Sequence, residues 1–150
     1  MERSNLVLQE FLILTKDQRI EVILHSYGVF LMTKLLAKTR NLNPDLACVA
    51  GLLHDISKVV DGVDDLTHAK LGAARAKAML GDNKLFSGNE IAIIEQAIKH
   101  HMEKVALHTP YDELLKDADV LEKYLSQTTD DWTSIHGKRL ASLPREFRGA

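Results

Sequence analysis

The residues best able to do chemistry are the pair His54-Asp55 and Lys58, which stands three residues after the aspartate. The pair ends an apolar run over 46–53, which predicts a buried helix whose small residues, such as Gly51, let a neighbouring helix approach closely. A polar pair at the end of a buried helix has to be solvated, paired with other groups or bound to a ligand. An imidazole nitrogen and a carboxylate oxygen form the mixed ligand set that borderline divalent metals accept. Because such a pair also occurs by chance, its meaning depends on what else the chain supplies.

Further residues of the same two kinds are spread along the chain, mostly near the ends of predicted helices. In order they are His25, His68, His100, His101 and Asp119. Singly, each has an ordinary structural interpretation: a hydrogen-bonded core histidine, a ring in water, a complement to a helix dipole or a salt-bridged carboxylate. These ordinary interpretations do not hold jointly, because the order and the placement on separate helices form one pattern. His108 and His136 are assigned no role.

The elements that position these residues are predicted to be helices. Apolar residues recur at steps of three and four, capping boxes are expected at 15–18 and 87–90, and Asn43-Pro44 supplies a cap and a first-turn proline. The chain holds no alternating, strand-like run of more than four residues. The sequence therefore predicts an all-α fold, a compact bundle of five or more helices. The expected helices cover about 5–14, 15–40, 44–53, 67–80 with Gly81 as the stop, 88–101, 109–126 and a short stretch near 134–141.

Composition sets the broad class of the protein. The 150 residues, with 45% hydrophobic and 27% charged side chains, predict a single soluble domain over 1–150, with a motif core at about 20–126 and a tail at 127–150. The net charge of −2 argues against a nucleic-acid partner. The lone Cys48, in an apolar run, is expected to be core filler in a reducing cytoplasm. The basic residues near the C-terminus, such as Arg139, are interpreted first as a solvated tail and second as a phosphate-attracting patch.

From about His25 to Asp119 the chain resembles the HD-domain superfamily of metal-dependent phosphohydrolases. The order of the histidines and aspartates carries the resemblance. Lys58 resembles the family's basic residue after the His-Asp pair, the segment 67–73 (THAKLGA) looks like its histidine followed by a Gly-Ala helix, and 116–122 (KDADVLE) looks like its Asp-Ala-Asp segment.

The resemblance implies an HD-type helical bundle with a metal ion held by His25, His54, Asp55 and Asp119. Members with a dinuclear site also use the equivalents of His68, His100 and His101, with Asp55 bridging both ions, so two ions of iron, manganese, nickel or zinc are expected. Converging histidines would otherwise repel when protonated, or stay unsatisfied when buried and neutral. Two such ions can lower the pKa of a shared water and hold a phosphate oxygen opposite it.

Two catalytic residues are expected, namely Asp55 and Lys58, whose ammonium would also bind the phosphoryl group. Lys104 is a second candidate for substrate binding, although a solvated lysine is the favoured interpretation. Asp117 is expected to orient a ligand or to face solvent.

The expected substrate is a small phosphate ester or nucleotide, with no nucleic-acid or membrane partner; a homodimer is left open. The segment 102–107 after the double histidine lacks the Gly-Tyr-Pro of the cyclic-dinucleotide branch, which argues against that activity. Two alternatives remain: a di-iron oxygenase of the same fold, and a non-catalytic metal-binding sensing module, which usually comes with lost ligands.

Overall fold

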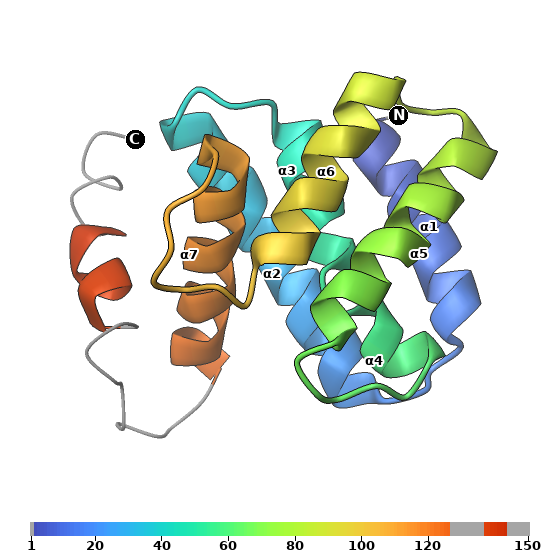
Figure 1. Cartoon of the computed structure of the whole chain (residues 1–150). Helices are drawn as coiled ribbons and strands as arrows, with labels where there is room; N and C mark the ends of the chain where they lie inside the picture. Colours follow the sequence, from blue (N-terminus) through green and yellow to red (C-terminus); the bar gives the residue numbers. More distant parts are fainter. Residues whose placement is uncertain (1, 127–136, 144–150) are drawn as a thin grey trace.

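A computed structural model describes residues 2–126 and 137–143 of the chain. Within these residues all regular secondary structure is helical, which confirms the all-α prediction (Figure 1). The helices are α1 (Arg3–Thr15), α2 (Ile20–Thr39), α3 (Pro44–Leu53), α4 (Ile56–Val60), α5 (His68–Asn83), α6 (Gly88–His100) and α7 (Pro110–Ser126). Residues 137–143 form a further helical stretch beside α7.

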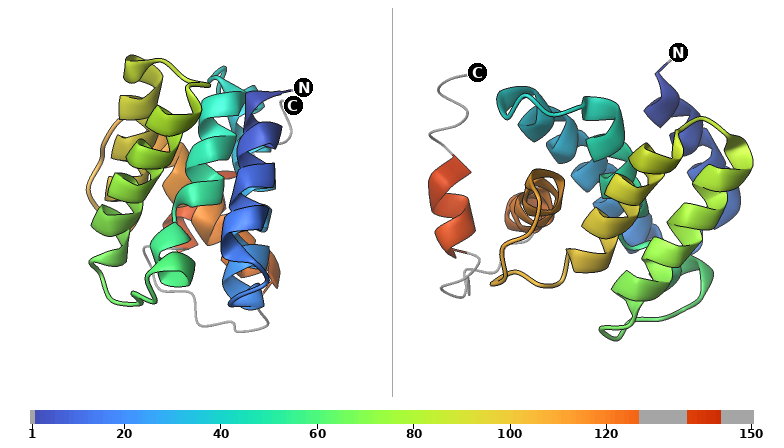
Figure 2. Two further views of the ribbon diagram at one scale, coloured as in Figure 1. Left: turned by 90° about the vertical axis from the view of Figure 1, so that its right-hand side faces the viewer. Right: turned by 45° about the horizontal axis from the view of Figure 1, so that its top comes forward.

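Helix α3 lies at the centre of the bundle, because all of its residues from Leu46 to Leu53 are buried. It packs against α1, α2, α6 and α7, and α5 covers α6 on the outer side (Figure 2). The predicted close approach occurs at Gly51, where an added Cβ would lie 2.8 Å from Thr33 Oγ1 and 3.0 Å from the carbonyl oxygen of Val29 in α2. Helices α2 and α3 therefore pack nearly backbone to backbone here.

Three of the predicted helix starts agree with the structure. The Asn43 side chain accepts a hydrogen bond from the Asp45 N–H, with Pro44 in the first turn. Ser87 and Glu90 form a complete capping box for α6. Helix α7 begins at Pro110, within a residue of the predicted start. Residues 137–143 overlap the short helix expected near 134–141, whose first three residues lie outside the described part.

Two predicted helix boundaries were wrong. Thr15 does not cap α2 but ends α1, where its hydroxyl donates to the Phe11 carbonyl oxygen; three left-handed residues then turn the chain before α2 begins at Ile20. Gly81 does not stop α5, which continues to Asn83 and ends at the left-handed Lys84. A hydroxyl can close a helix as well as open one, and one helical glycine costs only about 1 kcal/mol.

Among the described helices, α2 alone is long and apolar enough to cross a bilayer by length and composition. Part of this helix belongs to the core of the bundle, where Val29 and Leu36 are fully buried, and 44% of its apolar window is buried within the structure. His25 lies in the second turn of this helix.

Candidate metal centre

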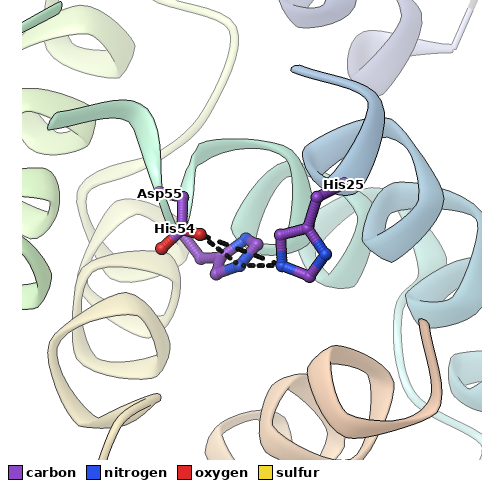
Figure 3. Close-up of side chains that lie close together, drawn as sticks. All are labelled: His25, His54 and Asp55. Carbon is purple, nitrogen blue, oxygen red and sulfur yellow. Dashed lines mark hydrogen bonds and ion pairs between the residues drawn. The ribbon is translucent and has the colours of Figure 1, made fainter. Parts of the chain in front are cut away.

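Six of the predicted metal ligands meet inside the bundle, and they come from five separate parts of the chain. His54 and Asp55 occupy the turn in which α3 ends and α4 begins. His25 lies in α2, His68 is the first residue of α5, His101 follows the last residue of α6, and Asp119 lies in α7. Figure 3 shows His25 pointing from α2 towards the His54-Asp55 pair. All six are buried except His25, whose side chain is 15% exposed.

The first group of ligand atoms, here called group one, comes from two histidines and two aspartates. The Nε2 atoms of His25 and His54 face each other at 3.1 Å. Asp119 Oδ1 lies 2.9 Å from the His25 nitrogen and 3.5 Å from the His54 nitrogen. Asp55 Oδ2 lies 3.4 Å from His54 Nε2 and 3.8 Å from His25 Nε2.

The second group, group two, consists of His68, His101 and the other oxygen of Asp55. The two Nε2 atoms again face each other at 3.1 Å. Asp55 Oδ1 lies 3.1 Å from the nitrogen of His68 and 3.5 Å from that of His101. Asp55 therefore contributes one oxygen to each group and joins them.

Backbone carbonyls determine which nitrogen of three imidazoles carries the proton. The Nδ1 atoms of His54, His68 and His101 each donate to the carbonyl oxygen three residues earlier, at 2.7 Å in every case. A carbonyl oxygen only accepts, so Nδ1 holds the hydrogen and the neutral ring presents the Nε2 lone pair to the centre. Facing lone pairs cannot hydrogen-bond to one another.

The donor set fits a bound cation. Asp55 Oδ1 and Asp119 Oδ1 are buried and find no hydrogen-bond partner among the described residues. Buried carboxylate oxygens and imidazole lone pairs turned towards one another are costly without a positive charge between them. The geometry thus provides two groups that could each hold a divalent ion.

The charges within the site keep both carboxylates ionised and His101 neutral. His25 differs, because although burial opposes protonation of its ring, Asp119 and Glu122 raise its pKa to about 9. Burial opposes ionisation of Asp55, but whenever one of the rings of His54, His101 and His68 carries a second proton, its positive charge outweighs burial and holds the pKa of Asp55 far below the usual range. Burial likewise opposes ionisation of Asp119, while Lys104 and His25 bring its pKa well below the usual value. Burial lowers the pKa of His101 to about 4, so this ring is neutral at neutral pH.

The two predicted lysines each contact one of the two carboxylates, Lys58 through an oxygen that also belongs to group one and Lys104 through the oxygen that faces away from it. Lys58 Nζ lies 3.1 Å from Asp55 Oδ2, at the edge of the site, with 23% of its side chain exposed. Lys104 Nζ lies 2.7 Å from Asp119 Oδ2 and also donates to the His101 carbonyl oxygen. Lys104 is therefore largely buried rather than solvated, and burial lowers its pKa. Since Lys104 occupies Oδ2 of Asp119, Oδ1 is left for group one.

His100 lies outside both groups, although the dinuclear pattern includes it. Its Nδ1 donates to the buried Asp112 at 2.7 Å, and its ring stacks on His108 at 3.9 Å between centroids. His100, Glu103 and His108 are close enough to form a third candidate metal group. However, His108 Nδ1 accepts a hydrogen bond from the Lys116 ammonium at 2.8 Å, so the neutral His108 ring carries its hydrogen on Nε2. Neither nitrogen of His108 then has a free lone pair for a metal ion.

Two other side chains depart from their predicted roles. Asp117 pairs with Arg40 at 2.7 Å and with Arg139 at 2.8 Å, so it neither orients a ligand nor faces solvent freely. Arg139 is not part of a solvated tail, because it also binds Glu113 at 3.0 Å and fastens residues 137–143 to α7. Cys48 is fully buried as predicted, and burial raises the pKa of its thiol to about 12.

A cavity of about 370 Å³ opens onto group one. Its lining combines cationic, acidic and apolar side chains: Glu21, Val22, Leu24, His25, Asp55, Lys58, Glu122, Lys123 and Ser126. A larger cavity of about 660 Å³ between α1 and α5 touches neither group of ligand atoms, so the smaller one is the route to the site.

Two residues of this site were missed in the sequence. The Glu122 carboxylate contacts His25 Nδ1, and Lys123 Nζ lies 3.4 Å from Asp119 Oδ2. Both follow Asp119 by one helical turn and thus share its face of α7. Their spacing from Asp119 in the sequence could therefore have indicated that both residues lie beside the site.

The helical fold and the converging histidines and carboxylates define a metal-dependent hydrolase. Residues 22–124 match the family model of the HD domain. The chain therefore belongs to the HD domain family, whose domains bind divalent metals. The solved structure of a predicted HD superfamily hydrolase from an uncultured Thermotogales bacterium superposes with a TM-score of 0.64 over 95% of this chain and 90% of that one, at 23% identity. This likeness concerns the fold.

Curated relatives carry the name ribonuclease Y. The protein of Thermotoga petrophila is 35% identical over 122 residues, which are 81% of this chain and 22% of the relative. That of Thermus thermophilus is 33% identical over 124 residues, which are 83% of this chain and 20% of the relative. The chain thus spans about a fifth of the length of these relatives.

These relatives overturn the expected partners. Enzymes named for cleaving RNA contradict a small-molecule substrate without a nucleic-acid partner. The reasoning from a net charge of −2 failed because charge summed over the chain does not describe the cations beside a buried site. The expected absence of a membrane partner belonged to the same prediction and is withdrawn with it.

Proposed function

We propose that this HD domain hydrolyses phosphodiester bonds of RNA with two divalent transition-metal ions, iron, manganese, nickel or zinc. His25, His54, Asp55 and Asp119 would hold the first ion, and Asp55, His68 and His101 the second. The two oxygens of Asp55 carry the proposal, because they face two separate pairs of imidazole nitrogens. His100 is left out of the ligand set, because its ring is engaged with Asp112 and His108.

Ions in these groups would supply an activated water and offset charge on the phosphate oxygens. The protein's own residues supply orientation and further positive charge. Lys58 lies at the cavity wall, where its ammonium can exchange the Asp55 oxygen for a phosphate oxygen of the substrate. Lys123, with 35% of its side chain exposed on the same cavity, is placed to meet a neighbouring phosphate of the chain.

The substrate class rests on the ribonuclease relatives and on the form of the cavity. A polynucleotide presents a phosphate on each side of the cleaved one, and two lysines flank the ligand groups here. Val22 and Leu24 add apolar surface on the α2 side, against which a sugar or base can rest. A compact site of this kind needs no basic protein surface, since bound ions and two lysines neutralise the contacted phosphates.

The test begins with the metal content of protein purified without chelator and then follows cleavage of a labelled single-stranded oligoribonucleotide. We expect two ions per chain and metal-dependent cleavage. Asp55→Asn should lose metal and cleavage together, because it alters a ligand shared by both groups. Lys58→Ala should keep the metal and lose about 10²–10³-fold in turnover, from the worth of one charged contact in a dry site. Lys77→Ala, an exposed lysine of α5, is the matched control.

Several outcomes would contradict the proposal. Metal-loaded protein that leaves RNA intact but consumes dioxygen would be an oxygenase, and protein that binds metal and turns over nothing would be a sensing module. One ion per chain would remove the dinuclear assignment. We further propose that 1–150 acts as one HD domain and that it works in the reducing cytoplasm, in keeping with its single buried thiol.

A further inference from the structure

His25 is held differently from the other three imidazoles of the site. His54, His68 and His101 stand at helix ends, where a carbonyl three residues earlier is free to accept from Nδ1. His25 lies inside α2, one turn beyond its start at Ile20, where the preceding carbonyls accept backbone N–H groups of the helix. Its Nδ1 therefore needs an acceptor from outside α2.

Glu122 of α7 supplies that acceptor. Its carboxylate contacts His25 Nδ1, and only 13% of the side chain is exposed. The opposite nitrogen of the same ring, Nε2, faces Asp119 Oδ1 at 2.9 Å in group one. Because Asp119 and Glu122 lie one turn apart on α7, this helix contacts both nitrogens of the His25 ring.

Gly28 provides the space in which Glu122 lies. It follows His25 by three residues on α2, and an added Cβ would lie 2.6 Å from Glu122 Cγ and 3.1 Å from its Oε1. The contacted atoms belong to a side chain, so a methyl group at this position would displace Glu122 rather than the backbone. Glycine at position 28 is therefore explained by the space that Glu122 needs and not by backbone conformation, because its φ lies outside the left-handed region.

We infer that Glu122 is a positioning residue for His25, that Gly28 is required to seat it, and that the pair controls metal affinity at group one alone. The inference rests on the proposed metal site. A carboxylate on Nδ1 fixes the tautomer and orientation of the ring and increases the donor strength of Nε2. Group two has its own carbonyl acceptors and does not depend on Glu122.

Zinc titration by calorimetry of chelator-treated protein tests the inference, with Zn²⁺ alone as the probe. Glu122→Ala should weaken one of two binding events by about 10–100-fold, the range for lost outer contacts of a ligating histidine. Glu122→Gln should restore part of the affinity, because its amide oxygen still accepts from Nδ1. Gly28→Ala should weaken zinc binding as much as Glu122→Ala does. The double variant should lose no more zinc affinity than either single variant, because both changes remove the same contact.

Gly28→Ala also separates positioning from folding. Alanine is the better helix former, so the metal-free variant should be as stable as the wild type or more so while binding zinc less well. Gly81→Ala, with open space around its Cβ, and Glu95→Ala, on the surface, are controls that should leave both zinc affinities unchanged.

An independent readout is the nitrogen spectrum of the metal-free imidazoles. The His25 Nδ1 resonance should move in Glu122→Gln, while those of His68 and His101 should stay. Wild-type affinities at both sites in Glu122→Ala, or equal losses at both, would overturn the inference. Wild-type protein that binds two zinc ions yet cleaves no RNA would overturn the proposed function alone, and protein that binds no zinc would overturn both.

Discussion

Replacing Gly51 by alanine should destabilise the protein, although alanine is the better helix former. The new methyl group would lie 2.8 Å from Thr33 Oγ1, 3.0 Å from its Cγ2 and 3.0 Å from the Val29 carbonyl oxygen. Thr33 is fully buried and its hydroxyl bonds to the carbonyls of Val29 and Phe30, so neither neighbour has room to yield. Helices α2 and α3 would have to move apart.

The magnitude follows from two opposing terms. Alanine gains about 1 kcal/mol of helix propensity over glycine, while overpacking a close helix contact costs about 1–3 kcal/mol and reaches its upper range where backbone is struck. We expect a net loss of about 1–2 kcal/mol. For a protein of this size that corresponds to a fall in Tm of roughly 3–6 °C.

Thermal and urea unfolding of the metal-free protein measure this loss, with Gly81→Ala as the matched control. Gly81 also lies inside a helix, but its added Cβ meets nothing within 4 Å. The control should gain about 0.5–1 kcal/mol. If Gly51→Ala is as stable as the wild type, or gains as much as the control, the close approach of α2 and α3 is not a constraint. A second consequence is weaker zinc binding, because the Gly51 carbonyl holds His54 Nδ1.

Two further predictions concern single side chains. Lys104→Met should lower zinc affinity about 10–100-fold without changing KM for RNA, because its ammonium holds Asp119 Oδ2; a raised KM at unchanged affinity would instead return Lys104 to substrate binding. Asp45 accepts the Ser4 N–H and pairs with Arg3, and although burial opposes ionisation, these contacts lower its pKa below the usual 3.8. The contribution of Asp45 to the free energy of unfolding is therefore fully present above pH 3.8 and is lost as the pH falls through the lowered pKa. Asp45→Asn should cost about 1 kcal/mol at pH 7, as for a lost helix cap, and the gap to wild type in urea unfolding should shrink towards pH 3. A gap that stays constant would be evidence against this linkage.

The helices were predictable because their signals are local. Caps at Asn43 and Ser87 and the proline at the start of α7 act over three or four residues, within reach of sequence reasoning. The wrong boundary at Thr15 has the same origin, since a hydroxyl can serve either end of a helix and the choice depends on how α1 docks. The left-handed residues after it leave no local pattern.

The order of histidines and aspartates, through its resemblance to the HD-domain superfamily, nominated candidate ligands, and the structure brings six of these seven residues together. The sequence could not predict which histidine of the pair His100-His101 faces the centre of the bundle. His100 and His101 point about 100° apart on their helix, and only the docking of α6 against α3 and α5 turns His101 inward and leaves His100 to Asp112. The same limit applies to Lys104. The sequence favoured a solvated side chain, whereas in the structure its ammonium contacts Asp119 of α7. Local propensities specify the helices, whereas burial and the partners of each side chain arise from contacts between residues distant in sequence, which no local pattern records.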